Sequence, residues 1–202
     1  MSDRIMKAML VNTSMHEHGC TDRALREIAD VLKAQGIQAD IFWLGKGHIA
    51  DSLEPKTEPD IVDQLDKLIS DYDAFVFGSP VYYANANARL TAFLNRIFYG
   101  KGKRFNGKVG AGIASCRRAG GVTTVDEIQH WMELCSMIVP TSCYWNVVHG
   151  NTPSEVEQDK EGINVMRQLG EMIAYCLKLK KLGDENGIEP VILPTVRTNF
   201  IR

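Results

Sequence analysis

The chain has 202 residues, of which 45% are hydrophobic and 24% charged, and its formal net charge is −2. Such a length and composition are typical of one globular domain, which we expect over residues 1–202 with a C-terminal tail from about residue 182. Because the charge is nearly balanced and no long block of like charge occurs, neither nucleic acid nor an anionic membrane is an expected partner.

The sequence also gives expectations for the cellular location and for metal binding. No apolar run approaches the ~18 residues that a membrane span needs, and the N-terminus lacks a secretory signal, so we expect a cytoplasmic protein. The five cysteines are scattered without a C-x-x-C pair, which favours reduced free thiols and no metal site. They are Cys20, Cys116, Cys135, Cys143 and Cys176.

Short apolar runs alternate with segments of helical periodicity along the whole chain. The expected strands are residues 6–11, 39–44, 74–77, 108–114 and 138–144, and the expected helices are residues 21–35, 61–69, 88–98, 122–137 and 154–181. This alternation predicts parallel strands joined by crossover helices that cover both faces of the sheet. The expected fold is an α/β doubly wound three-layer sandwich, which binds ligands beyond the carboxyl ends of its strands.

The first loop at that edge has the sequence NTSMHEHGCTDRAL, from Asn12 to Leu25. It is rich in hydroxyl groups and leads directly into a helix, whose first backbone N–H groups have no internal partner. Such a helix start favours a phosphate group. The loop has no lysine and no G-x-x-x-x-G-K or G-x-G-x-x-G pattern, so a monophosphate fits better than a triphosphate or a dinucleotide. The alternative is that Thr21 only caps the helix.

The second loop, Gly78-Ser79-Pro80-Val81-Tyr82-Tyr83, follows the third expected strand. Gly78 permits close approach of the backbone to a ligand, Pro80 stiffens the loop, and a tyrosine ring can cover the face of a planar heterocycle. The alternative is a turn that ends the strand, with two core tyrosines.

The third loop, Ser115 to Gly121, contains Arg117 and Arg118 followed by paired glycines. Backbone donors and a positive charge are suited to a carbonyl edge that gains negative charge on reduction. The alternative is a solvated pair of arginines. Because all three loops are expected at the same edge of one sheet, a shared ligand site is the better hypothesis.

These loops resemble a known family. Asn12-Thr13-Ser14 through Gly19-Cys20-Thr21, then GSPVYY with Arg89-Leu90 to Arg96 behind it, are similar to the flavodoxin-fold NADPH-dependent FMN reductases, which are close to the multimeric flavodoxin-like quinone reductases and iron-sulfur flavoproteins. The resemblance covers residues 6 to about 179. Members usually show N-G-S-P and G-N-T in the first loop, where this chain has Thr13, Met15 and Cys20 at the glycine, proline and asparagine positions.

The resemblance implies a flavodoxin-like sheet of order 2-1-3-4-5, bound FMN, and NAD(P)H as co-substrate. The compact cysteine cluster of the iron-sulfur branch is absent from this chain, so no cluster and no other metal are expected. No catalytic side chain is implied, because the flavin carries the chemistry. The implied cofactor-binding residues are Asn12, Ser14, His16, Gly19, Cys20, Thr21, Ser79, Pro80, Val81, Tyr82, Tyr83, Ser115, Cys116, Arg117, Arg118, Gly120 and Gly121. Taken alone, His16 and His18 are expected to face solvent.

The predicted function is that of an oxidoreductase passing hydride from NAD(P)H through FMN to a quinone, free flavin or similar small acceptor. The alternatives are a flavodoxin-type electron carrier that docks to redox proteins, and a ligand-binding protein without turnover. The family's habit of assembling implies a homodimer or homotetramer, in which Phe98, Tyr99 or Trp145 of a second subunit closes the site.

Overall fold

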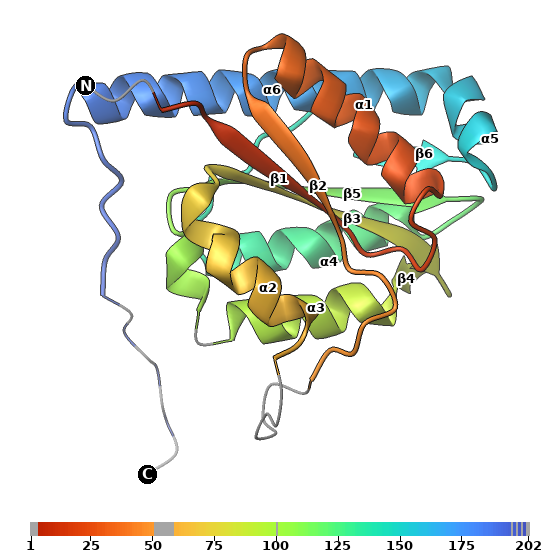
Figure 1. The fold of residues 1–202 in the computed structure, drawn as a ribbon, viewed down its shortest axis with the longest axis horizontal. Coiled ribbons are helices and arrows are strands. Elements are labelled where there is room, and N and C mark those ends of the chain that lie inside the picture. The colour runs from red at the N-terminus through yellow and green to blue at the C-terminus, as the bar shows by residue number, and fades with distance from the viewer. Residues whose placement is uncertain are drawn as a thin grey trace.

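The computed structural model describes residues 4–50, 59–99 and 101–194, together with residues 196, 198 and 200. Five strands pair in parallel in the order β2-β1-β3-β5-β6, and the short β4 pairs antiparallel with the end of β3 (Figure 1). Counted along the chain, the parallel strands follow the predicted order 2-1-3-4-5. The strands are β1 (Lys7–Asn12), β2 (Gln38–Trp43), β3 (Ala74–Tyr82), β4 (Asn85–Ala86), β5 (Val109–Cys116) and β6 (Val147–His149).

Helices cover both faces of this sheet (Figure 1). The α-helices are α1 (Cys20–Ala34), α2 (Ile61–Leu68), α3 (Ala88–Phe98), α4 (Gly121–Leu134), α5 (Pro153–Gln158) and α6 (Lys160–Glu185), and two 3₁₀ turns span Ile69–Asp71 and Gly102–Phe105. In β3, Ala74 and Val76 pack with α1 and α6, whereas Phe75 and Phe77 pack with the layer of α2, α3 and α4. Strands buried on both faces read as continuous apolar runs, which is why periodicity located them.

Two helix boundaries differ from the prediction. The helix α1 begins at Cys20 with Gly19 as its N-cap, so Thr21 lies in the first turn and is not the cap. The long helix expected over residues 154–181 is broken at Asp159, whose side chain accepts a hydrogen bond from the Gly162 N–H and thereby caps α6. That helix continues to Glu185, slightly beyond the expected start of the tail.

The expected strand at residues 138–144 is wrong. In that segment Ile138 makes a single bridge to Val109, and the strand beside β5 is formed instead by Val147–His149. Pro140 has no N–H to donate to a strand ladder, whereas Val147 and Val148 are buried and pair with β5. The loop that follows the fifth parallel strand is therefore residues 150–152, which lead into α5.

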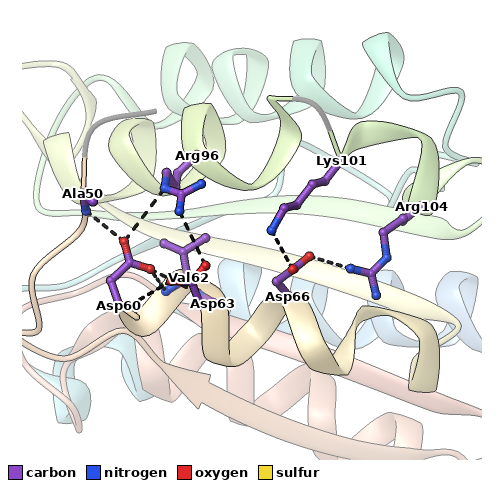
Figure 2. Close-up of polar contacts among 8 residues, drawn as sticks. All are labelled: Ala50, Asp60, Val62, Asp63, Asp66, Arg96, Lys101 and Arg104. Carbon is purple, nitrogen blue, oxygen red and sulfur yellow. Dashed lines mark hydrogen bonds and ion pairs between the residues drawn. The ribbon is translucent and has the colours of Figure 1, made fainter. Parts of the chain in front are cut away.

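A cluster of ion pairs joins α2 to α3 and the turn after it (Figure 2). Asp60 and Asp63 form a capping box at the start of α2, and Arg96 of α3 lies 3.9 Å from Asp60 and 3.5 Å from Asp63. One turn further on, Asp66 pairs with both Lys101 and Arg104. Arg96, part of the family resemblance, therefore holds two helices together.

The length and apolar character of the described helices determine whether any of them could cross a membrane. None of them combines the length and the apolar character that crossing a bilayer requires.

Candidate functional site

A cavity of about 450 Å³ opens at the carboxyl ends of the strands. We call it the carboxyl-edge cavity. It is lined by residues 14–21 after β1, 80–82 at the end of β3, 115–117 at the end of β5, and 150–153 after β6, with Met15 and Glu17 outside the lining. It adjoins the switch point between β1 and β3, where a doubly wound sheet offers a crevice, and its volume is within the ~300–1,000 Å³ of small-molecule sites.

The loop after β1 is fixed to its neighbours by hydrogen bonds. Thr13 donates from its N–H (3.1 Å) and its hydroxyl (2.8 Å) to the Gly78 carbonyl, and the Trp43 indole donates to the Ser14 carbonyl at 2.8 Å. The Asn87 amide donates to the Thr13 carbonyl at 3.1 Å. The loop is therefore held in place before any ligand enters.

One end of the cavity is rich in hydrogen-bond donors. The helix α1 starts at Gly19 without a side-chain cap, so the N–H groups of its first turn are left for a ligand. Ser14 Oγ accepts from the His16 N–H at 3.1 Å and keeps its own proton to donate. Thr21 Oγ1 and Ser115 Oγ are 2.8 Å apart, and since that bond uses one hydroxyl proton, the other is left over.

The charges at this end suit an anion. Asp22, in the first turn of α1, is paired with Arg26 at 2.7 Å, so its negative charge is partly compensated. Arg117 lines the cavity, and no lysine does so among the described residues. A phosphate monoester therefore fits the donor set of this end.

The other end is walled by Pro80, Val81 and Tyr82. Tyr83 is 101% exposed and does not line the cavity. Tyr83 and Ala84 both have positive φ, at 51° and 64°, in the tight turn between β3 and β4. Non-glycine residues in this region cost roughly 1–3 kcal/mol each and are concentrated at functional sites.

Gly78 has a different role from the one predicted. A Cβ at this position would lie 2.9 Å from Thr21 Cγ2 and 3.1 Å from Leu25 Cδ1. The glycine therefore permits α1 to pack against β3, rather than permitting a ligand to approach the backbone.

Two thiols line the cavity. Burial, helped by the charge of Glu155 and opposed by a backbone hydrogen bond, raises the pKa of Cys20. Burial and the charge of Asp159, opposed by hydrogen bonds from the Gly121 and Arg118 backbone, raise the pKa of Cys116. Both groups are therefore neutral at neutral pH and are not thiolate nucleophiles.

The structure brings most of the predicted site residues together. Those that line the carboxyl-edge cavity are Ser14, His16, Gly19, Cys20, Thr21, Pro80, Val81, Tyr82, Ser115, Cys116 and Arg117. Asn12 and Ser79 do not: the Asn12 amide bonds the Glu17 carbonyl and the Ser14 N–H, and the Ser79 hydroxyl bonds the Pro80 carbonyl and the Asn87 N–H. Arg118, Gly120 and Gly121 line a neighbouring cavity instead.

Sequence reasoning missed part of the lining. Residues 150–153 were not recognised because the fifth strand was placed too early, and His18, whose side chain is 72% exposed as expected, also borders the cavity. The motif His149-Gly150-Asn151-Thr152-Pro153 does carry a signal: it follows two apolar residues and opens a helix at which Thr152 is the N-cap.

Comparisons with known proteins agree with this geometry. An iron-sulfur flavoprotein of Methanocaldococcus jannaschii is 26% identical over 192 residues, which cover 87% of this chain and 100% of that protein. An NAD(P)H quinone oxidoreductase of Candida albicans is 30% identical over 93 residues, covering 45% of this chain and 46% of that protein. The solved structure of RosB, with bound 8-demethyl-8-formylriboflavin-5′-phosphate, has a TM-score of 0.73 at 13% identity and covers 96% of this chain and 92% of its own.

The fold is thus that of the flavodoxin-like α/β proteins, as predicted. The profile of the NADPH-dependent FMN reductase family matches residues 6–152, and the chain belongs to this family. It is a flavin-dependent oxidoreductase with FMN as cofactor and NAD(P)H as co-substrate. The donor set around Ser14, Thr21 and the start of α1 fits the phosphate of FMN.

The residues do not fit an iron-sulfur cluster, although the archaeal relative is named an iron-sulfur flavoprotein. Within the described parts of the chain, no three His, Cys, Asp or Glu side chains are grouped to hold a metal ion. The five cysteines are free, and among them Cys135 is buried, Cys143 is exposed, and Cys176 lies on α6.

Proposed function

We propose that the protein transfers hydride from NAD(P)H, through FMN in the carboxyl-edge cavity, to a quinone, a free flavin or a similar small acceptor. The observation that carries this proposal is the convergence of four loops on one cavity, with phosphate-binding donors at one end and the Pro80–Tyr82 wall at the other. The similarity to a quinone oxidoreductase supports a quinone as the acceptor.

In this proposal the phosphate of FMN accepts hydrogen bonds from the N–H groups at the start of α1 and from the hydroxyls of Ser14 and of the Thr21–Ser115 pair. The Thr21–Ser115 bond joins α1 to the end of β5, so binding the phosphate also fixes two elements relative to each other. Because the donors are preorganised, little conformational entropy is lost on binding.

The ring of FMN would lie between residues 80–82 and residues 115–117. When bound there, FMN supplies a site that takes up hydride from one substrate and delivers it to the next. The chain itself orients the ring and places the positive charge of Arg117 near it, which favours a ring that gains negative charge. The neutral thiols of Cys20 and Cys116 do not compete as nucleophiles.

Assembly is also part of the proposal. Tyr99 is 63% exposed and remains a candidate for closing the site of a second subunit in a homodimer or homotetramer, whereas Trp145, at 55% exposure, lines a cavity of its own chain. Phe98 is not a candidate, because it is 5% exposed and packs in the core against Phe77, Phe105 and Trp131. Size-exclusion chromatography with light scattering measures the assembly directly.

A visible absorption spectrum tests the proposed function. Purified protein mixed with FMN and freed of excess ligand should retain the yellow flavin band, and anaerobic NADPH should bleach it. Addition of a quinone should restore the band. Double-reciprocal plots of the steady-state rate should be parallel, because one flavin serves both substrates in turn. A protein that retains no FMN would contradict the proposal, and one that retains FMN but is not reduced would be a carrier or binding protein.

A further inference from the structure

A second cavity, of about 330 Å³, lies beside the carboxyl-edge cavity. We call it the Trp145 cavity. It is formed between the start of α4, the strand β6 and the start of α6, and Arg118, Tyr144, Trp145, His149, Asp159 and Glu161 are among its lining residues. Its volume is at the lower end of the ~300–1,000 Å³ that small-molecule sites occupy, which suits one ring system with a sugar better than a whole dinucleotide.

A short, fixed loop separates the two cavities. Arg117 lines the carboxyl-edge cavity and Arg118 the Trp145 cavity. The Cys116 thiol donates to the Arg118 carbonyl at 3.7 Å, and the Gly150 N–H donates to the Cys116 carbonyl at 3.0 Å. Gly120 packs so closely on the β3–β4 turn that a Cβ there would lie 2.5 Å from Ala84 Cα. Consecutive residues of one loop, Arg117 and Arg118, therefore line the two cavities.

The Trp145 cavity offers a surface for stacking. Tyr144 and Trp145 are 57% and 55% exposed, and their rings meet edge to face with centroids 4.4 Å apart. This contact restrains the indole while leaving ring surface available. Tryptophan and tyrosine faces bind planar bases of any kind, because stacking does not depend on hydrogen-bond readout.

The Trp145 cavity also contains two carboxylates. Both oxygens of Asp159 accept backbone hydrogen bonds, from His149 N–H at 2.7 Å and Gly162 N–H at 2.9 Å, so this side chain is fixed. Glu161 lines the cavity beside it. One arginine against two carboxylates disfavours a polyphosphate inside the cavity, whereas ribose hydroxyls and an exocyclic amine can donate to the carboxylates.

We propose that the Trp145 cavity binds the adenosine half of the nicotinamide dinucleotide, with the base stacked on Trp145. The nicotinamide half then reaches the carboxyl-edge cavity, and the pyrophosphate crosses residues 117–120 beside Arg117 and Arg118. This inference rests on the proposed function, since it requires a nicotinamide dinucleotide to approach the flavin. A dinucleotide has two ring systems joined by a negatively charged pyrophosphate. These parts match the two cavities and the two arginines of the loop between them.

The test uses the FMN-loaded protein and two probes that divide the dinucleotide. ADP-ribose carries the adenosine half without nicotinamide, and its binding is measured by isothermal titration calorimetry. Reduced nicotinamide mononucleotide carries the other half, and its oxidation is measured by steady-state kinetics. The variant is Trp145→Ala, with Trp145→Phe to retain a ring. Tyr175→Ala, at 56% exposure on α6, is the control for loss of an exposed aromatic side chain.

We expect Trp145→Ala to weaken ADP-ribose binding by about tenfold or more, the range that base stacking on an aromatic ring supplies. The KM for NADH, whose adenosine half ADP-ribose reproduces, should rise by a similar factor, while kcat/KM for the reduced mononucleotide stays within twofold. Trp145→Phe and Tyr175→Ala should remain near wild type in all three measurements.

The inference is overturned if wild-type protein oxidises NADH but does not bind ADP-ribose, or if Trp145→Ala leaves ADP-ribose binding unchanged. Equal losses with both donors also overturn it, because they would place Trp145 at the nicotinamide. Failure of the wild-type protein to retain FMN is a different result, and it overturns the proposed function. The visible spectrum of each variant separates these cases, since a loaded variant keeps the flavin band.

Discussion

The described helices begin in two contrasting ways. The helix α2 has a full capping box, in which Asp60 accepts from two backbone N–H groups and Asp63 bonds back to the cap residue. The helices α3, α5 and α6 are capped by the side chains of Asn87, Thr152 and Asp159. By contrast, α1 and α4 start at Gly19 and Gly120 with no side-chain cap.

Both uncapped helices face a cavity, α1 the carboxyl-edge cavity and α4 the Trp145 cavity, and the capped starts of α5 and α6 line these cavities as well. An uncapped first turn leaves N–H donors that cost free energy unless water or a ligand satisfies them. The starts of α1 and α2 thus differ most clearly: the capped start of α2 is joined to α3 by ion pairs (Figure 2), whereas the uncapped start of α1 faces the carboxyl-edge cavity. Changes at the two kinds of helix start should separate binding from stability.

The largest effect is expected from Gly19→Asp, which puts a capping carboxylate at the start of α1. The side chain would accept from the free N–H groups and repel the phosphate, at about 4 kcal/mol for unit charges 4 Å apart near a protein surface. We expect FMN affinity to fall about 100-fold or more, measured by fluorescence titration of FMN.

Gly19→Ala is the matched control, because both variants place a Cβ 3.1 Å from His16 Cβ. If the alanine variant loses as much affinity as the aspartate variant, crowding rather than the filled helix start explains the loss.

The opposite pattern is expected for Asp60→Ala at the capped start of α2. It removes the cap and one partner of Arg96, whose side chain is 11% exposed, and should lower the free energy of unfolding by about 2–3 kcal/mol. Urea denaturation of the FMN-free protein measures this loss, and FMN affinity should stay within twofold. Asp60→Asn, which keeps a capping oxygen, should lose less. A large fall in FMN affinity would contradict the proposed separation of FMN binding from stability.

A smaller effect on binding is expected from Thr21→Val. The change keeps the volume but removes the hydroxyl paired with Ser115 Oγ at 2.8 Å, so the remaining Ser115 hydroxyl is no longer held in a fixed orientation toward the phosphate. A hydrogen bond to a charged group contributes roughly 1.5–3 kcal/mol, and we expect FMN binding to weaken about tenfold. Thr21→Ser should bind like wild type. If the valine and serine variants bind FMN with equal affinity, the Thr21 hydroxyl does not contribute to phosphate binding.

The smallest effect is expected at the turn between β3 and β4. Ala84 has φ of 64°, a conformation that glycine adopts without strain. After allowing for the greater freedom of glycine in the unfolded chain, Ala84→Gly should raise the free energy of unfolding by about 0.5–1 kcal/mol. Thermal denaturation of the FMN-free protein measures it, and a clear loss of stability would show that the turn is not strained.

Much of the fold was predictable, because the strands buried on both faces, such as β1 and β3, are continuous apolar runs between amphipathic helices. The fifth parallel strand was not, since β6 has only three residues and a longer apolar segment around Ile138 precedes it. Three residues are too few for periodicity to register.

The site was predictable to the extent that strand ends determine which loops meet. The roles of single residues were less so. Asn12 and Ser79 sit in the right loops, but local hydrogen bonds occupy their side chains. The sequence predicts that Gly78 makes room for a ligand. In the structure a Cβ at this position would instead clash with Thr21 and Leu25 of α1, a contact that exists only in the packed fold.

The most direct test of the account compares the affinities of wild-type protein for FMN and for riboflavin, which differ only by the phosphate. If the start of α1 and the hydroxyls of Ser14 and Thr21 hold that phosphate, FMN should bind at least about 100-fold more tightly, since several charge-assisted hydrogen bonds are lost without it. Equal affinities would contradict the assignment of the carboxyl-edge cavity as the FMN site.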